Sequence, residues 1–169
     1  MLRKMVVHAL LAVAAVALQV ASASAIDLTG TWTDERSTCR QLLPTGEVVR
    51  FKDNQVVVEN MNITQFGDGS MNVAQGSFNY RGRAYAKGSN PATRGEGFID
   101  KCDSPVPDDQ AGWRIKNAKT FPPDSNGVTG AMKVELFHAH KSSFGDSFEV
   151  CQVRFARSST TNPNVAACP

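Results

Sequence analysis

His138-Ala139-His140 is the segment of the sequence with the most distinctive chemistry. Residues i and i+2 of a β-strand project from one face, so the imidazoles of His138 and His140 can chelate a transition metal. Parity places both on the face that Leu136 also uses, at the rim of an interior. No third ligand is identifiable, and Lys141-Ser142-Ser143 indicates that the strand ends there. The alternative is a pair of exposed turn histidines without a metal.

The same two histidines limit the catalytic chemistry, because they are the only ones after residue 25. A Ser-His-Asp or Cys-His mechanism would have to lie at this one short locus. Carboxylates are numerous, but the sequence does not give their separations in space, so no acid–base pair is assigned. Gly67-Asp68-Gly69 and Gly95-Glu96-Gly97 lack the lysine and the following helix of a phosphate-binding loop and are typical of hairpin turns. No catalytic residue and no cofactor is predicted, and a small enzyme is the least favoured function class.

The beginning of the chain has the three parts of a secretory signal. Two basic residues precede an apolar run over residues 5–20, and residues 21–25 are all small. This pattern predicts a signal peptide over residues 1–25, which cleavage after Ala25 removes, and a secreted or periplasmic protein. A retained transmembrane anchor is the alternative, but a span needs roughly 20 apolar residues. Residues 26–169 contain no linker or repeat and predict a single β domain.

Four cysteines follow the predicted signal peptide. An even number of cysteines in an exported chain predicts two disulfides, and four cysteines allow three pairings. Their spacings contain no close pair of the kind that a zinc site of four cysteines uses. Four buried free thiols are the alternative. The residues concerned are Cys39, Cys102, Cys151 and Cys168.

The charge balance gives no sign of a nucleic-acid partner. The full sequence has 18 Lys and Arg against 16 Asp and Glu, and the predicted signal peptide carries two of the basic residues. The remaining chain therefore has a net charge near zero, and it contains no basic stripe. No segment after the signal peptide is apolar enough to span a membrane. A protein partner is not identified by the sequence.

Periodicity predicts the fold class. Turn-forming residues divide residues 26–169 at intervals of roughly 8–15 residues, which is typical of a β-sandwich or a β-barrel. Between the turns the alternation has period two: Met61 and Ile63 share one face, and Asn62 lies on the other. Strands with one dry face and one wet face form an antiparallel sheet around a core. The phase of the alternation changes at Gly76, which predicts a β-bulge there.

Gly30-Thr31-Trp32, near the start of the predicted mature chain, resembles the Gly-x-Trp signature of the calycin superfamily, which includes lipocalins and avidins. The resemblance implies an all-β fold, an antiparallel up-and-down barrel of about eight strands. In that family the tryptophan of the first strand packs at the barrel base against a basic residue of the last strand. Trp32 matches the tryptophan, and Arg154 or Arg157 matches the basic residue. The alternation of the strands alone also fits a β-sandwich.

The same resemblance favours one pairing of the cysteines. With the first and last strands as antiparallel neighbours and Trp32 opposite Arg157, Cys39 falls within one residue of the position opposite Cys151. The favoured disulfides are therefore Cys39–Cys151 and Cys102–Cys168.

A barrel of this kind has an interior that can hold a ligand. Asn117 and Lys119 share the parity of Trp113, which places polar groups among apolar neighbours, where they can orient a ligand. The alternative is a strand that bulges after Ile115, so that both polar residues face water. The predicted ligand-binding residues are Phe78, Tyr80, Phe98, Trp113, Asn117 and Lys119.

The leading prediction is thus a secreted or periplasmic, lipocalin-like β-barrel that binds a small apolar or amphipathic molecule and has no cofactor. The alternative is an envelope-associated or extracellular protein-interaction module, whose barrel is filled by its own side chains and whose loops make the contacts. An enzyme is the second alternative. A hollow barrel with polar groups at one end favours the first function, and a filled barrel favours the second.

Overall fold

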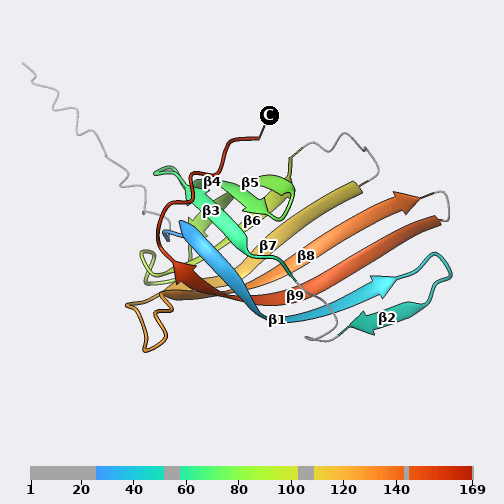
Figure 1. The fold of residues 1–169 in the computed structure, drawn as a ribbon, viewed down its shortest axis with the longest axis horizontal. Helices are drawn as coiled ribbons and strands as arrows, with labels where there is room; N and C mark the ends of the chain where they lie inside the picture. Colours follow the sequence, from blue (N-terminus) through green and yellow to red (C-terminus); the bar gives the residue numbers. More distant parts are fainter. Residues whose placement is uncertain (1–25, 52–57, 103–108, 143–144, 169) are drawn as a thin grey trace, which may run out of the picture.

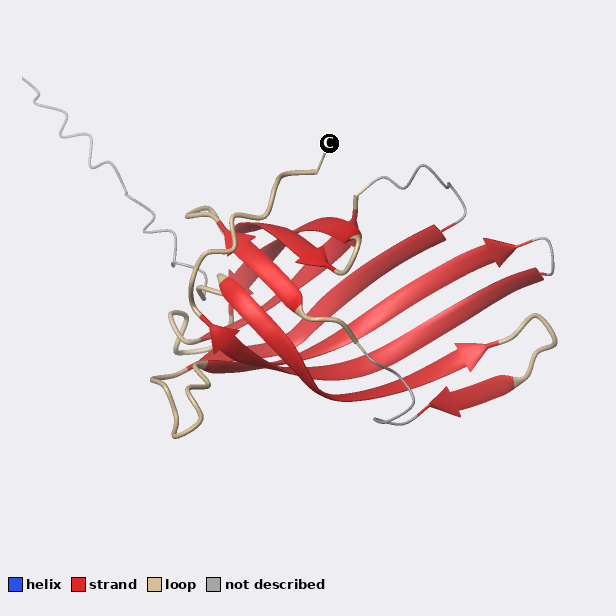
Figure 2. Cartoon of the chain, viewed as in Figure 1, coloured by secondary structure: helices blue, strands red, loops and turns tan. Residues whose placement is uncertain are grey.

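The computed structural model describes residues 26–51, 58–102, 109–142 and 145–168. The predicted signal peptide therefore lies outside the described residues. All regular secondary structure in the described part of the chain is β-strand (Figure 2). The strands are β1 (Gly30–Leu42), β2 (Val48–Phe51), β3 (Met61–Gln65), β4 (Ser70–Gln75), β5 (Phe78–Ala86), β6 (Arg94–Lys101), β7 (Asp109–Thr120), β8 (Gly130–Ser142) and β9 (Gly145–Ser159).

The nine strands form one antiparallel sheet that closes on itself (Figure 1). Their order is β2-β1-β3-β4-β5-β6-β7-β8-β9, and β1 also pairs with β9. The first half of β1 pairs with β3, whereas its second half, Cys39–Leu42, pairs with β2. The result is an eight-stranded barrel to which β2 adds one further strand. The predicted fold class is confirmed, and the β-sandwich alternative is wrong.

The alternation of side chains explains why the sheet curls around a core. In β8, Met132 and Val134 point inward and are 1% and 2% exposed, whereas Lys133 between them faces water. Burial of the apolar face of every strand at once requires the sheet to close, because a closed sheet also leaves no unpaired edge. The largest fully buried side chains of the core are Trp32, Phe155, Ile26, Leu28, Met61, Ile63, Met71, Ile99, Ile115, Met132, Val73 and Val134.

The two ends of the barrel differ because the strands differ in length. β3 and β4 have 5 and 6 residues, whereas β1, β8 and β9 have 13, 13 and 15. The long strands extend together beyond the short ones, as Figure 2 shows. We call the end at Trp32 the closed end, and the end toward which β1 continues to Cys39 and Leu42 the open end. The packed core occupies the closed half of the barrel.

Trp32 and Arg157 cover the closed end. Trp32 is fully buried, and its Nε1 donates a hydrogen bond of 2.9 Å to the Leu28 carbonyl. The guanidinium of Arg157 lies 5.6 Å from the centroid of the Trp32 ring. It also donates to the Asp27 carbonyl at 3.0 Å and to Thr129 Oγ1 at 3.0 Å. Burial lowers the pKa of Arg157, and Asp27 acts in the opposite direction.

Gly30, the glycine of the Gly-x-Trp sequence, allows two chain segments to approach closely. Its φ is +134°, a conformation that residues with a side chain rarely adopt. A Cβ atom at this position would also collide with the carbonyl of Ser159. Arg154, the other candidate partner of Trp32, faces outward and forms an ion pair of 3.0 Å with Glu35.

Gly76 is not a β-bulge, contrary to the expectation from the phase change. It lies in the two-residue turn between β4 and β5, where Gln75 is the register partner of Phe78. The residue numbers of the two partners that flank a two-residue turn differ by three. The inward-facing residues therefore have odd numbers in β4 and even numbers in β5. A φ of +56° at the first turn residue suits the glycine.

Register shifts of the barrel occur elsewhere. In β9, Ser158 is an extra residue between the pairs Thr31–Ser159 and Trp32–Arg157. In β1, Glu35 is an extra residue between the pairs Asp34–Phe155 and Arg36–Arg154. In β7, a corresponding shift occurs at Lys116, between Ile115 and Asn117, against both neighbouring strands. Each such bulge turns the residues that follow to the opposite face of the sheet.

Both predicted disulfides are present. Cys39 of β1 is bonded to Cys151 of β9, and Cys102, which follows β6, is bonded to Cys168 in the C-terminal segment. The C-terminal segment is also held against the barrel by Asn162, whose Oδ1 accepts a hydrogen bond of 2.8 Å from Thr64 Oγ1. The cross-links therefore tie the first strand to the last strand and the chain terminus to the middle of the sheet.

Candidate functional site

A cavity of about 410 Å³ lies above the packed core, toward the open end of the barrel. Its floor follows from the order of the side-chain layers. Ile115, Val134 and Val153 form one buried layer, and Trp113 and Leu136 come next along β7 and β8. The cavity is lined by the apolar residues Val58, Phe78, Tyr80, Ala111, Trp113 and Leu136, by the polar residues Glu59, Gln75, Lys101, His138 and Glu149, and by Cys151.

The apolar wall is built around Tyr80 and Trp113, which are 4% and 3% exposed. Trp113 packs edge-on against Phe155 of the core, with the ring centroids 6.2 Å apart. Phe78 lies at the mouth and is 46% exposed. A gradient from a dry floor to a half-exposed aromatic rim suits a molecule that enters with its apolar part first.

Charged groups gather on the cavity wall above the apolar floor. Lys101 ends β6, is the register partner of Tyr80, and places its Nζ 4.3 Å from the centroid of the Phe78 ring. On the neighbouring wall, His138 of β8 is the register partner of Glu149 of β9, and its Nδ1 lies 3.7 Å from Glu149 Oε2. The side chains of His138 and Glu149 are 34% and 28% exposed, so both can meet a ligand.

Trp113 carries an unsatisfied hydrogen-bond donor. Its Nε1 is buried and has no acceptor among the described residues. A buried donor without a partner costs about 1–3 kcal/mol, so natural proteins keep few of them. The indole of Trp32, by contrast, satisfies its Nε1 at the closed end.

Three of the predicted ligand-binding residues meet in this cavity, namely Phe78, Tyr80 and Trp113. Phe98 does not, because it lies on the outer face of β6, where it is 46% exposed and packs 6.0 Å from the ring of Tyr85. The inward residue of that part of β6 is Ile99, which is fully buried.

Asn117 and Lys119 also lie away from the cavity. The bulge at Lys116 reverses the parity of β7, so that Ala118 points inward and is fully buried. Lys119 is exposed on the outer face, and Asn117 shares that face with it. The alternative of a bulge after Ile115 describes this strand correctly.

The two histidines of the predicted metal pair lie two residues apart on β8. His138 lines the cavity beside Glu149. The backbone of His140 is opposite Ser147, one row nearer the rim, and its side chain lies outside the described part of the structure. The strand continues to Ser142, so neither histidine belongs to a turn.

Sequence reasoning missed Lys101 and Glu149 as members of the site. The alternation of the last strand does indicate an inward direction for Glu149, because Glu149, Cys151 and Val153 are spaced by two residues and so share one face of the strand. Lys101 shares the parity of Ile99, but a lysine at the end of a strand reads as a solvent-facing residue. Its inward direction follows from its register partner Tyr80, which lines the same cavity.

The comparisons with known proteins give no further guide to this site. No protein-family model, no curated protein sequence and no solved structure matches the chain. In the described part of the chain, no helix has the length and apolar character needed to cross a membrane.

Proposed function

We propose that this protein is a secreted or periplasmic binding protein that holds a small apolar or amphipathic molecule in the cavity at the open end of its barrel. The observation that carries the proposal is the combination of a packed closed half with a cavity above it. Side chains alone would fill the whole interior if the barrel served only as a scaffold. A volume of about 410 Å³ lies within the usual range of small-molecule sites, roughly 300–1,000 Å³.

The lining favours an amphipathic ligand. Its apolar part would pack on Trp113, Tyr80 and Leu136, and its polar part would meet Lys101 and His138 nearer the mouth. A few convergent polar groups on an apolar wall fix the orientation of a ligand, whereas the apolar contacts supply most of the affinity. No reaction is required for this function, and we propose binding rather than catalysis.

The compartment is supported by two independent features. Two disulfides are typical of extracellular and periplasmic proteins. The first 25 residues have the pattern of a cleaved export signal. The calycin-like assignment has the support of Trp32, which lies at the closed end under Arg157 of the last strand.

The proposal can be tested with an amphipathic fluorescent probe, anilinonaphthalene sulfonate, titrated into the folded protein. We expect binding that is lost in Leu136→Trp, in which a larger side chain occupies the cavity without removing any part of the wall. Phe98→Ala is the matched control, because it removes an aromatic ring from the outer face. Native mass spectrometry of protein purified gently from its own host should in addition show a mass adduct.

The two arms have clear negative outcomes. Equal probe binding by the parent protein and Leu136→Trp would place the probe outside the cavity and contradict the proposal. Absence of both probe binding and an adduct would contradict it as well.

One observation favours the alternative of a protein-interaction module. Leu42, Val48 and Phe148 are cross-strand neighbours on the outer face of β1, β2 and β9, and they are 44%, 54% and 42% exposed. Such an exposed apolar row is a common feature of protein contact sites. Phe148→Lys should abolish a protein contact at this face and leave probe binding in the cavity unchanged.

A further inference from the structure

The disulfide between Cys39 and Cys151 lies among side chains that bind metals. Cys39 and Cys151 are register partners on β1 and β9, and Glu149 is two residues before Cys151 on the same inward face. His138 is the register partner of Glu149 on β8. Three adjacent strands therefore bring two sulfur atoms, one carboxylate and one imidazole to a single patch of the cavity wall.

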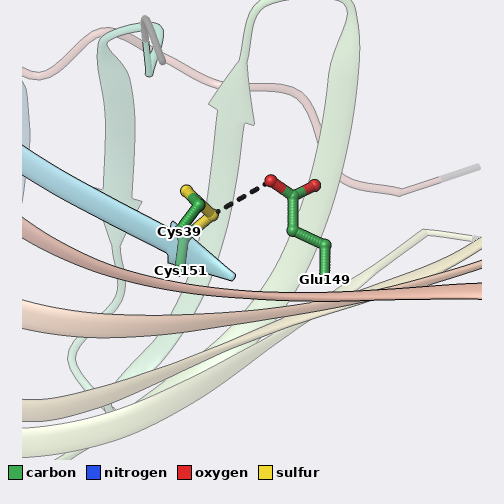
Figure 3. Close-up of side chains that lie close together, drawn as sticks. All are labelled: Cys39, Glu149 and Cys151. Atoms are coloured by element: carbon green, nitrogen blue, oxygen red, sulfur yellow. Dashed lines mark hydrogen bonds between the residues drawn. A yellow bond between two sulfur atoms is a disulfide. The ribbon is translucent and has the colours of Figure 1, made fainter. Parts of the chain in front are cut away.

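Figure 3 shows the carboxylate of Glu149 directed toward the disulfide of Cys39 and Cys151. Glu149 Oε1 lies 3.3 Å from Cys151 Sγ, and Glu149 Oε2 lies 3.7 Å from Nδ1 of His138. The ligand atoms of Cys39, Glu149 and Cys151 all lie within 4.8 Å of one another. Because Cys151 is in a disulfide, its Sγ has no hydrogen to donate. The short distance between Glu149 Oε1 and this sulfur is therefore a van der Waals contact and not a hydrogen bond. Among the described residues, no other group of three or more His, Cys, Asp or Glu side chains brings its possible metal-ligand atoms this close together.

We propose that the dithiol form of this pair binds one zinc ion through Cys39, Cys151, Glu149 and His138. Thiolate, imidazole and carboxylate are the groups from which proteins build tetrahedral zinc sites. Two thiolates on one zinc ion lie about 3.7 Å apart, given Zn–S bonds of about 2.3 Å. Rotation of the two side chains can reach this separation, because the strands that carry them are hydrogen-bonded neighbours.

The chemical steps balance with a dithiol as the reductant. The reductant supplies two electrons and two protons, the Sγ–Sγ bond breaks to give two thiols, and the reductant becomes a disulfide. Zinc then displaces both thiol protons and meets an ionised carboxylate and a neutral imidazole. In the oxidised protein the sulfur atoms are bonded to each other, so the site opens only on reduction.

The cavity supplies the route to the site. Cys39 and Cys151 are 0% and 1% exposed, but Cys151, Glu149 and His138 all line the cavity. A small dithiol and a metal ion can reach the patch through the open end. The zinc ion would then join β1 to β9 at the position of the broken covalent link.

This inference goes beyond the proposed binding function and does not depend on it. The metal site exists in the reduced protein, whereas the amphipathic ligand occupies the cavity of the oxidised protein. Failure of zinc binding would leave probe binding by the oxidised protein untouched, and failure of probe binding would leave the metal measurement untouched.

The test uses cobalt(II) as a spectroscopic substitute for zinc. The Cys102→Ser/Cys168→Ser protein retains only the pair of interest, is reduced with dithiothreitol, and is freed of the reductant without oxygen. We expect one equivalent of cobalt to give a thiolate-to-cobalt absorption and the visible bands of a tetrahedral site. Zinc should displace the cobalt, and the oxidised protein should show neither band.

Two variants separate this site from simple binding to two thiols. Glu149→Gln and His138→Ala keep the cysteines and should each weaken cobalt binding at least about tenfold. Equal affinity in these variants and the parent would overturn the proposal. So would the absence of a thiolate-to-cobalt absorption from the reduced Cys102→Ser/Cys168→Ser protein. Glu149→Gln and His138→Ala can also be compared with the parent in the chain that keeps all four cysteines, so the comparison does not depend on the folding of the Cys102→Ser/Cys168→Ser protein.

Discussion

Cys39 lies directly opposite Cys151 because β1 contains one residue more than β9 between this pair and the Trp32–Arg157 pair. Glu35 is the extra residue. If Glu35 were paired in a regular ladder instead, Cys39 would face Val150, and the sulfur atoms would leave opposite faces of the sheet. A single bulge thus couples the covering of the closed end to the cross-link near the open end.

Deletion of Glu35 should therefore leave the cross-link intact, because the residue is unpaired and the strand without it still brings Cys39 opposite Cys151. Insertion of one alanine after Arg36 should instead move Cys39 by one position relative to Cys151. Loss of this disulfide, which closes a separation of 112 residues, would cost up to about 4–5 kcal/mol in the chain-entropy model. The deletion removes only an exposed ion pair with Arg154, worth about 0–1 kcal/mol. Peptide mapping without reduction and denaturant unfolding measure both effects. Loss of the Cys39–Cys151 peptide in the deletion variant would show that Glu35 is not the unpaired residue.

Trp32→Ala should lower the free energy of unfolding by about 3–5 kcal/mol, because it empties a fully buried position and removes the aromatic face beneath Arg157. Probe binding by the protein that remains folded should not change, since Trp32 is at the end opposite the cavity. Denaturant unfolding and probe titration provide the two readouts. A loss of less than about 1 kcal/mol would remove the main support for the calycin-like assignment.

Arg157→Lys should destabilise the protein although the charge is kept. The guanidinium donates through three nitrogen atoms to Thr129 and Asp27, and a lysine ammonium cannot reproduce this planar arrangement. We expect a loss of about 2–3 kcal/mol, which is the scale of one or two charged hydrogen bonds in a partly buried site. Arg154→Lys, on the exposed face of the same strand, should change the stability by less than about 0.5 kcal/mol. Equal effects of the two substitutions would contradict a specific role of the hydrogen bonds that the Arg157 guanidinium donates.

The two tryptophans should respond differently to replacement by phenylalanine. Trp32→Phe leaves the Leu28 carbonyl without its indole donor, at a cost of about 1–3 kcal/mol plus the loss of packing. Trp113→Phe removes a buried donor that has no acceptor among the described residues, so the lost packing is offset, and we expect a change within about 1 kcal/mol. Thermal or denaturant unfolding of both variants tests the contrast. A larger loss in Trp113→Phe than in Trp32→Phe would indicate that Nε1 of Trp113 has a partner in the folded protein.

Local alternation was sufficient to predict an antiparallel sheet around a core and the inward position of residues such as Met61, Ile63 and Trp113, whereas the choice of a barrel over a β-sandwich came from the Gly-x-Trp resemblance. It failed wherever one extra residue changes the parity. Asn117 and Lys119 were placed inside because the bulge at Lys116 leaves no mark in the sequence. A bulge is a property of two paired strands, and its energy depends on contacts across the sheet rather than on the residue itself.

The turn at Gly76 differs from the predicted bulge for a related reason. A two-residue hairpin and a bulge both reverse the phase of the alternation, and both favour glycine. The aromatic character of Phe98 predicts an interior position, yet the inward position beside it belongs to Ile99. The members of the site that sequence reasoning missed, Lys101 and Glu149, are charged residues whose inward direction follows from the neighbouring strands.

The pairing of β1 with β9 also constrains how the chain can fold. These are the first and last strands along the chain, and the link from Cys39 to Cys151 spans 112 residues. Contacts between such distant segments require a large loop to close before they yield stabilisation, which slows folding. The barrel cannot close until β9 has been synthesised, because β9 pairs with β1. Until then, part of the apolar face of β1 remains exposed. Truncation before β9 would leave both β1 and β8 with open edges, and such fragments should aggregate rather than fold.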